Sequence, residues 1–372
     1  MQVPYFDLKQ QFSGLRDEIM QALECVCSDA AFVLGEEVAE FEKEFAAYCE
    51  AGYCVALNSG TSALHVALLA LGVKAGDEVI TTPNSFVATA SAITYVGAKP
   101  VFVDVDPTTA NLDPALIDLA VSERTTAIIP VHLYGRPADM APILEIASKY
   151  NLAVIEDACQ AHGARYRAKR VGSIGHAAAF SFYPSKNLSA YGEGGALTTN
   201  DPGIARLARS LRNHGMSGPY THERIGYNYR MEGFQGAVLR IKLKRLEQWN
   251  ARRKEIADLY RTVLQGASVE IRADDPRDER VYHLFTVYVE RRDAVRAALE
   301  ARGVRTAIHY PCPIHLQPAF ASLGFGPGRF PHVEHACARV LSMPFFPEMT
   351  NEQVRYAGEQ LAEVVGSANL RS

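Results

Sequence analysis

Residues 153–199 have the sequence AVIEDACQAHGARYRAKRVGSIGHAAAFSFYPSKNLSAYGEGGALTT, which carries the strongest indication of the fold. Three short runs in it, at 153–156, 178–182 and 195–199, have the length and composition of buried strands. Acidic, hydroxyl-bearing and basic side chains follow directly after the first two runs. Apolar strands that end in such side chains are typical of α/β proteins, where ligands bind beyond the carboxyl ends of the strands.

The same pattern continues on both sides of this stretch. Four further strands are predicted, at 53–57, 78–82, 100–104 and 126–131. Between the strands lie segments with apolar residues at helical spacing, several beginning at a Ser or Asp cap, at 62–71, 86–96, 139–150 and 201–213. Alternation of strands and helices over residues 54–200 predicts an α/β domain with a large, mostly parallel seven-stranded sheet covered on both faces.

The pattern changes after Gly233. We predict one long or kinked helix at 234–264, strands at 268–272 and 282–289, a helix at 292–303, a proline-rich turn at 311–318 and a last helix at 350–365. The chain is therefore divided into a large α/β domain at 1–240, with an N-terminal segment at 1–30, and a smaller C-terminal α+β domain at 241–372. The basic residues from Lys242 to Arg253 are expected on a solvated helix face rather than at a polyanion site.

Composition excludes several classes of protein. With 48% hydrophobic and 22% charged residues the chain is ordinary for a globular protein, and its net charge of −4 argues against nucleic-acid binding. The N-terminus shows no basic segment followed by an apolar run, so no signal peptide is predicted. Residues 51–73 carry no charge, but Gly60 and several polar residues favour a buried strand–loop–helix unit over a membrane span. Seven scattered cysteines favour a reduced, cytoplasmic protein.

Three strand ends carry the residues suited to chemistry. The first strand is followed by NSGTS (58–62), whose free amides at a helix start suit a phosphate, although hydroxyl residues also cap many ordinary helices. Asp157 follows an apolar strand, where a carboxylate requires a partner in a binding site or in a structural ion pair. Lys186 follows another strand in an apolar, glycine-rich setting that lowers the pKa of an amine, unless it lies in a surface loop.

These three features together match the needs of pyridoxal phosphate (PLP). That cofactor requires a phosphate cradle, a partner for its pyridinium nitrogen and a lysine that binds its aldehyde. Phe86, which follows the second strand, is placed to stack on the ring. Asp157, Cys159 and His162 are also metal-ligand types, but no further ligand stands at a suitable spacing, so no metal is expected.

A set of ordered motifs extends over nearly the whole chain: PYFDL (4–8), NSGTSAL (58–64), GDEVI (76–80), VIEDACQAHG (154–163), SFYPSKNL (181–188), GEGGA (192–196), GYNYRM (226–231) and HYP (309–311). On these motifs the chain resembles the DegT/DnrJ/EryC1/StrS family of sugar aminotransferases, a branch of the fold-type I PLP enzymes. Residues 181–190 are most similar to the members that aminate C3 ketosugars, although Ser189 and Glu193 stand where Gly and Asp are common.

The resemblance implies a role for each matching residue. Lys186 would bind the cofactor aldehyde and, once released, would move the proton between cofactor and substrate carbons. Asp157 would keep the pyridine nitrogen protonated. The other implied cofactor ligands are Gly60, Thr61 and Ser181 at the phosphate, Phe86 on the ring face, Gln160 near the ring hydroxyl, and Asn228 at the phosphate of the partner subunit's cofactor. Implied in substrate binding are Tyr183, Arg230 (unless it makes a structural ion pair), His309 and Tyr310, the last two also from across the dimer.

The implied reaction is a two-stage transamination. L-glutamate would convert PLP to pyridoxamine phosphate, and a keto group of a UDP- or dTDP-linked sugar, at C3 rather than C4, would then take the amine. A homodimer with shared active sites is implied, with no nucleic-acid or membrane partner. The alternatives are a C4 ketosugar aminotransferase and, in a different class, a cofactor-binding regulatory protein without turnover.

Overall fold

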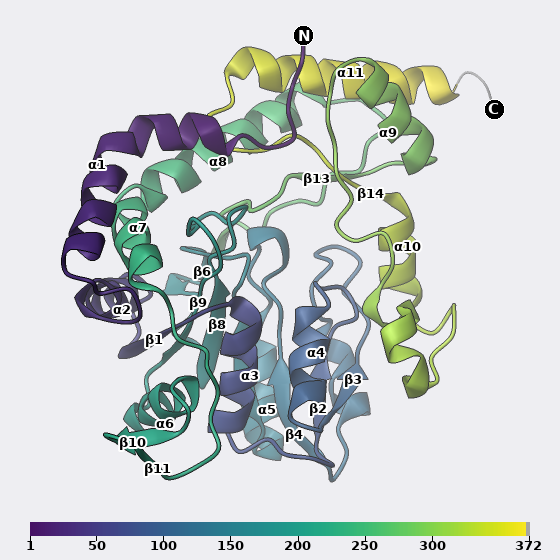
Figure 1. The fold of residues 1–372 in the computed structure, drawn as a ribbon. Helices are drawn as coiled ribbons and strands as arrows, with labels where there is room; N and C mark the ends of the chain where they lie inside the picture. The colour runs from purple at the N-terminus through teal and green to yellow at the C-terminus, as the bar shows by residue number, and fades with distance from the viewer. Residues whose placement is uncertain (370–372) are drawn as a thin grey trace.

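A seven-stranded sheet forms the centre of the computed structural model, which describes residues 1–369 (Figure 1). The strands lie in the order β1-β9-β8-β5-β4-β2-β3. Their bounds are Tyr53–Leu57 (β1), Glu78–Thr81 (β2), Lys99–Phe102 (β3), Thr125–Ile129 (β4), Ala153–Asp157 (β5), Ala177–Ser181 (β8) and Gly195–Thr199 (β9). Strand β9 is antiparallel to β1 and β8, whereas the pairs from β8 to β3 are parallel. The mostly parallel sheet predicted from the sequence is confirmed, with each strand displaced by no more than two residues.

Helices cover both faces of the sheet, and the strands are apolar on both sides for this reason. On one face, Ile155 and its counterparts on the other strands pack with α3 (Gly60–Ala70), α4 (Ala88–Tyr95) and α6 (Pro202–Arg212). On the opposite face, Val154 packs with α5 (Met140–Tyr150). Nearer β1, the second face is covered by α2 (Glu36–Tyr48), whose Phe41 and Phe45 pack against β8 residues.

The uncharged stretch at 51–73 forms β1 and α3, as predicted. Gly60 is the first residue of α3, so the glycine stands at the beginning of the helix and does not interrupt it. Within residues 1–369, no helix has both the length and the apolar character needed to cross a membrane.

The predicted helix at 234–264 is two helices, α7 (Gly233–Leu243) and α8 (Leu246–Val263), which corresponds to the kinked alternative. The prediction that its basic residues are solvated was wrong for Lys242 and Arg253, which are 0% and 2% exposed. Arg253 donates to the backbone oxygens of Tyr282 (3.2 Å) and His283 (3.3 Å), and these acceptors allow its burial.

The C-terminal part is built around a small antiparallel sheet of β13 (Thr286–Tyr288) and β14 (Val340–Ser342). The predicted strand at 268–272 was wrong: it is reduced to one bridge between Glu270 and Tyr288. The predicted strand at 282–289 is shortened to β13. The helices are α9 (Arg292–Ala301), α10 (Pro331–Arg339), which was not predicted, and α11 (Asn351–Asn369).

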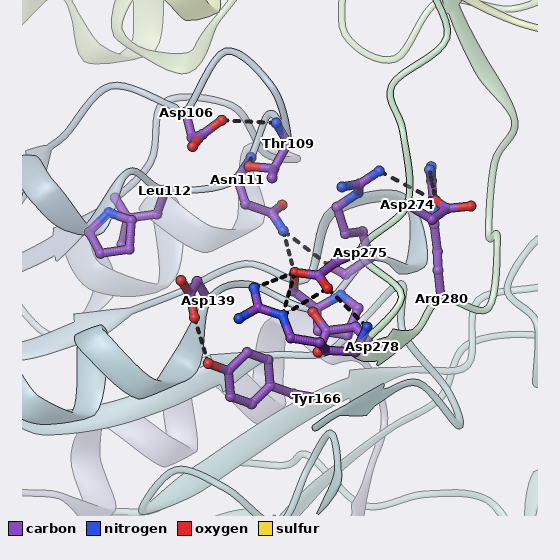
Figure 2. A pocket seen from close by; sticks show the side chains of 14 residues that line it. Asp106, Thr109, Asn111, Leu112, Asp139, Tyr166, Asp274, Asp275, Asp278 and Arg280 are labelled. Atoms are coloured by element: carbon purple, nitrogen blue, oxygen red, sulfur yellow. Dashed lines mark hydrogen bonds and ion pairs between the residues drawn. The ribbon is translucent and has the colours of Figure 1, made fainter. Parts of the chain in front are cut away.

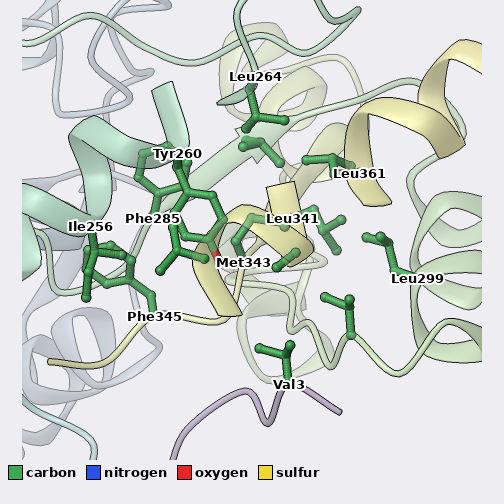
Figure 3. Close-up of a cluster of buried hydrophobic side chains, with 14 of the residues drawn as sticks. Val3, Ile256, Tyr260, Leu264, Phe285, Leu299, Leu341, Met343, Phe345 and Leu361 are labelled. Atoms are coloured by element: carbon green, nitrogen blue, oxygen red, sulfur yellow. The ribbon is translucent and has the colours of Figure 1, made fainter. Parts of the chain in front are cut away.

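The largest apolar cluster of this part joins α8, α9, α11 and both strands (Figure 3). Tyr260, Phe285 and Leu361 lie in it together with Val3 from the N-terminus. Val3 also pairs with Val304, so the first residues pack with the C-terminal part although they were assigned to the large domain. The next helix, α1 (Leu8–Ser28), packs on α7 instead. A domain division at 240/241 remains a prediction.

Short strands complete the fold outside the main sheet. These are β6 (Arg165–Tyr166), β7 (Lys169–Arg170) and β12 (Asp278–Glu279) in one sheet, and β10 (Met216–Gly218) and β11 (Thr221–His222) in another.

Candidate active site

The amino end of α3 meets the ends of β5 and β8 at the carboxyl edge of the sheet. A Cβ atom at Gly60 would lie 2.7 Å from Cβ of Ser181 and 2.8 Å from Sγ of Cys159. No side chain larger than hydrogen fits there without displacing these neighbours. The absence of a side chain therefore lets the backbone amides at the start of α3 lie directly against the two loops that follow the strands.

The start of α3 combines an ordinary helix cap with amides that remain available. Oγ of Ser59 accepts from the amide of Ser62 (3.1 Å), and the hydroxyl of Ser62 donates to Oδ1 of Asn58 (2.7 Å). The amides of Gly60 and Thr61 precede this capped position and have no acceptor within the helix. The two alternatives for this motif, a cap and an anion site, are therefore compatible.

Two consecutive acids at the end of β5 have different surroundings. Glu156 is fully buried, and its carboxylate accepts from the amides of Gly172 (3.0 Å), Ile174 (2.9 Å) and Gly175 (2.8 Å) and contacts Nε2 of His132 (3.1 Å). These bonds saturate the carboxylate and tie the 172–175 turn to the sheet. Glu156 is accordingly the structural acid of the pair.

Asp157 lies on the other face of the same strand. Its Oδ2 accepts from the hydroxyl of Thr89 on α4 (2.7 Å), and its Oδ1 accepts from the amide of Cys159 (3.3 Å). Thr89 was not singled out in the sequence. The feature that could have identified Thr89 is its spacing of four residues from Ser85, another hydroxyl residue. In the structure, Oγ of Ser85 lies 2.7 Å from Oγ1 of Thr89, so the two hydroxyl groups and Asp157 form a chain.

Lys186 lies in the loop after β8, close to Asp157 and Cys159. Burial lowers the pKa of its amine, while the negative charges possible on Cys159 and Asp157 act in the opposite direction. The sequence predicted this desolvation from the apolar surroundings, and the structure agrees. Lys186 is half-buried rather than fully exposed, so its side chain does not stand free on a surface loop.

Two aromatic rings lie at the site, and one of them, Tyr310, is close to Asp157 and Cys159. The ring centroid of Tyr310 lies 6.2 Å from that of Phe86, whose side chain is 55% exposed although it lies next to a buried site. Nε2 of Gln160 donates to the hydroxyl of Tyr310 (3.1 Å), and Oε1 of Gln160 accepts from the amide of Tyr134 (2.8 Å). Phe86 therefore presents an open ring face, and Gln160 is held in one orientation.

His309 and Tyr310 belong to the site of their own chain. The expectation that they come from across the dimer was wrong, because Tyr310 contacts Gln160 and Phe86 of the same chain. Nδ1 of His309 lies 2.9 Å from Oγ of Ser342 on β14, which fixes the loop from the C-terminal part over the sheet edge.

Two further imidazoles, His162 and His283, lie near Lys186 together with His309. Burial and, secondly, the charge of Lys186 lower the pKa of His162 to about 3 and that of His309 to about 4, and they lower the pKa of His283 well below its usual range. All three rings are therefore neutral at physiological pH. No sequence pattern points to His283, and His162 stands out in the sequence only as a metal-ligand type and as part of the 154–163 motif.

Asn228 and Arg230 are not among the residues that surround Asp157 and Lys186. They line a separate cavity of about 540 Å³ beside the start of α3, together with Asn58, Tyr191 and Glu193 among others. Nη1 of Arg230 donates to the side chain of Asn213 (3.0 Å), a neutral partner rather than an ion pair. Tyr183, the remaining predicted residue, is 50% exposed, and its amide donates to Oγ of Ser181 (3.4 Å).

Another cavity, of about 220 Å³, is lined mainly by charged side chains, with more aspartates than arginines (Figure 2). Arg277 pairs with Asp275, Arg280 pairs with Asp274, and the hydroxyl of Tyr166 donates to Asp139 (2.5 Å). Because its acids already have partners, this cavity offers no free set of ligands. Among residues 1–369, no group of three or more His, Cys, Asp or Glu side chains is arranged to hold a metal ion.

The sheet and the site at its edge define a fold-type I transferase, and structures of known aminotransferases superimpose on nearly the whole chain. The protein belongs to the DegT/DnrJ/EryC1/StrS aminotransferase family, whose model matches residues 14–362.

Several characterised relatives match this chain along almost its full length. A pleiotropic regulatory protein of Geobacillus stearothermophilus is 45% identical over 98% of this chain and 98% of its own. The dTDP-3-amino-3,4,6-trideoxy-alpha-D-glucose transaminase of Streptomyces venezuelae is 45% identical over 94% of this chain and 93% of its own. The UDP-N-acetyl-3-dehydro-alpha-D-glucosamine 3-aminotransferase of Acidithiobacillus ferrooxidans is 44% identical over 95% of both chains.

Two solved structures show the same agreement. DesV of S. venezuelae, in complex with a ketimine intermediate, has a TM-score of 0.95 and 44% identity and covers 97% of this chain and 98% of its own. NtdA of Bacillus subtilis, with bound pyridoxamine phosphate, has a TM-score of 0.92 and 33% identity and covers 98% of this chain and 85% of its own.

Proposed function

We propose that this protein is a PLP-dependent aminotransferase that moves the amino group of L-glutamate to the C3 keto group of a nucleotide-linked sugar. The observation that carries the proposal is the meeting of Lys186, Asp157 and the start of α3 at one edge of the sheet. A lysine, an acid and an anion site are the three contacts that this cofactor requires.

The residues present fit the cofactor. The amides of Gly60 and Thr61 and the hydroxyl of Ser181 would hold its phosphate, since the missing side chain at Gly60 leaves the helix start open to this loop. Asp157 would bind the pyridine nitrogen, with Thr89 fixing the carboxylate from behind. Phe86 would lie on the ring face, and Gln160 would lie near the ring hydroxyl. The bound cofactor supplies an electron sink for the carbon that loses its proton.

Lys186 has the properties of the group that carries the proton. Its amine is desolvated, and burial lowers its pKa, so a larger fraction of the side chain is neutral and able to accept a proton. The neighbouring imidazoles are neutral because their pKa values are lowered as well. They therefore add no positive charge that would repel the protonated lysine.

The substrate side of the site is proposed from the residues around the lysine. Tyr310 and His309 are held over the sheet edge by Gln160 and Ser342, and Tyr183 is exposed nearby. Transfer to C3 is supported by the relatives from S. venezuelae and A. ferrooxidans, whose names both specify a 3-amino sugar. The first name specifies dTDP and the second UDP, so the proposal extends to a nucleotide diphosphate sugar and not to one nucleotide.

We propose a homodimer in which each chain completes the other's site. Asn228 and Arg230 line a cavity whose lining does not include Lys186, which suits residues that serve a second chain. Asn228 would reach the phosphate of the partner's cofactor, and Arg230 would bind an anionic group of the sugar nucleotide. A cytoplasmic location is proposed because all seven cysteines are unpaired.

The test of the function uses the purified protein with PLP, L-glutamate and a pair of dTDP-linked sugars that carry the keto group at C3 or at C4. Mass spectrometry of the product is expected to show an amino sugar from the C3 ketosugar. An amino sugar formed only from the C4 ketosugar would establish the C4 alternative. Bound PLP without amine exchange for either sugar would instead favour the regulatory role that the name of the G. stearothermophilus relative specifies for that protein.

A further inference from the structure

Lys242, near the end of α7, is a fully buried lysine with unusual partners. Its Nζ donates to the backbone oxygen of Ser189 (2.9 Å) and to the hydroxyl of the same residue (2.8 Å), and it lies 4.5 Å from the ring centroid of Tyr191. Among residues 1–369, Lys242 forms no ion pair. Glu348 is the acidic residue close enough to influence its charge, but the carboxylate of Glu348 accepts from Gln11 instead. Lysines are rarely buried without a carboxylate, so this side chain has a specific task.

Ser189 belongs to the loop that carries Lys186. The loop leaves β8 at Phe182 and returns where the amide of Ala190 donates to the oxygen of Phe182 (2.8 Å). Within it, the amide of Lys186 donates to the oxygen of Tyr183 (2.8 Å). The two bonds from Lys242 therefore act next to the closing point of the loop.

Two other buried polar side chains from the same pair of helices hold the loop. Oε1 of Gln235 on α7 accepts from the amide of Tyr191 (2.9 Å). Oδ1 of Asn250 on α8 accepts from the side-chain amide of Asn187 (2.9 Å). Gln235 and Lys242 stand two helical turns apart and so face the same side of α7. With the bonds from Lys242, these contacts reach Asn187, Ser189 and Tyr191, which are alternate residues of the segment that directly follows Lys186.

We propose that Lys242 is a positioning residue for Lys186, because its amine fixes the backbone and the side chain of Ser189 and thereby the loop that presents the lysine. The proposal rests on the function proposed above. Displacement of a reacting group by about 1 Å can lower a rate about 100-fold, so a loose loop would reduce turnover without removing any group that touches substrate. Ser189 adds the second acceptor, which a glycine at this position would lack.

The Lys242→Met variant tests whether Lys242 positions the loop through its hydrogen bonds or only fills space in the core. Methionine retains most of the side-chain volume but donates no hydrogen bond, so the oxygens of Ser189 lose their partner. We expect kcat to fall about 10-fold or more, with KM for both substrates within about two-fold of wild type. Amide hydrogen exchange at 187–191, measured on the protein as purified, is expected to become about 10-fold faster.

Lys244→Met is the matched control. Lys244 is exposed and follows Lys242 by two residues, at the C-cap of α7, so its loss removes a charge from the same helix end without releasing Ser189. This variant is expected to keep the wild-type kcat and exchange rates. Wild-type kcat and unchanged exchange in Lys242→Met would overturn the proposal.

Ser189→Ala decides the question if Lys242→Met does not fold. It removes one of the two acceptors and leaves the lysine in place, so exchange at 187–191 is expected to rise while the melting temperature stays close to wild type. Unchanged exchange in Ser189→Ala together with an unfolded Lys242→Met would show that Lys242 supports only the core. If the wild-type protein itself transfers no amine, the proposed function fails, whereas the exchange experiment still reports whether Lys242 fixes the loop.

Discussion

The carboxylates of Glu156 and Asp157, adjacent on β5, serve opposite faces of the sheet. Glu156 accepts from three amides of the 172–175 turn and contacts His132, whereas Asp157 faces α4 and accepts from Thr89. Successive residues of a strand alternate between the two faces, so one dipeptide supplies both a structural acid and the candidate site acid. The sequence left both possibilities open for Asp157, and the saturated partners of Glu156 favour the site role for Asp157.

Conservative amide substitutions should separate these roles. Glu156→Gln introduces a donor among groups that donate, and we expect it to lower the free energy of unfolding by about 1–3 kcal/mol with kcat nearly unchanged. Asp157→Asn should reduce kcat by about 100-fold or more and leave the melting temperature close to wild type. Thermal melts and steady-state rates on both variants check this, and the reverse assignment of effects would contradict it.

Gly60→Ala should disturb cofactor binding selectively. The added Cβ would meet Cβ of Ser181 at 2.7 Å and Sγ of Cys159 at 2.8 Å, so the start of α3 must move away from the loop proposed to hold the phosphate. We expect the Kd for PLP to rise about 10-fold, which equals about 1.4 kcal/mol. Gly14→Ala on α1 is the control, since nothing lies within 4 Å of its Cβ. Equal affinities in the two variants would remove Gly60 from the phosphate site.

Hybrid dimers test whether sites are shared. Lys186→Ala and Asn228→Ala are each expected to be strongly impaired alone. When the two inactive variants are mixed under conditions that exchange subunits, a hybrid dimer contains one intact site, with Lys186 from one chain and Asn228 from the other. Activity should therefore recover to about a quarter of wild type, because about half of the dimers are hybrids with one site each. A mixture that stays inactive would show that Asn228 serves its own chain.

Lys242 should make stability depend on pH in a predictable direction. Burial lowers its pKa to about 7, from about 10.4 in an unfolded chain. Between these values the unfolded state binds more protons, so the free energy of unfolding rises with pH by up to about 1.4 kcal/mol per pH unit. Below pH 7 the lysine is charged in both states and this stabilisation is absent.

The measurement compares wild type with Lys242→Met by denaturant unfolding at pH 6.5, 7.5 and 8.5. The free energy of unfolding of wild type should rise with pH relative to that of Lys242→Met, because methionine does not titrate. Glu348, whose pKa burial raises, is present in both proteins, and Lys244→Met supplies the baseline for an exposed lysine. A difference that does not vary with pH would show that the buried amine has an ordinary pKa.

The sequence was sufficient for the main sheet because each strand is a short apolar run between helix-period segments. Strands β1 and β9 were predicted to the residue, and the site residues Asp157, Lys186 and Gly60 followed from their places at strand and helix ends. Strands of a parallel sheet are buried on both faces, so each strand appears in the sequence as a continuous apolar run.

Errors arose where distant segments decide the environment. Lys242 and Arg253 look like solvated helix residues, but their acceptors, Ser189 and the backbone at 282–283, are remote in sequence. The contact of Tyr310 with Gln160 likewise depends on how the C-terminal part lies over the sheet edge. Helix α10 and strand β14 were missed because their short apolar segments have no periodicity that stands out.

The visible absorption spectrum of the purified protein, before and after addition of L-glutamate, tests the central claim most directly. With PLP bound, we expect a yellow absorption band that glutamate bleaches, and a cofactor that borohydride links covalently to wild type but not to Lys186→Ala. Exposed Lys169 supplies the control, and Lys169→Ala should retain the borohydride link. A protein that shows no band even after PLP is added would contradict the account at its centre.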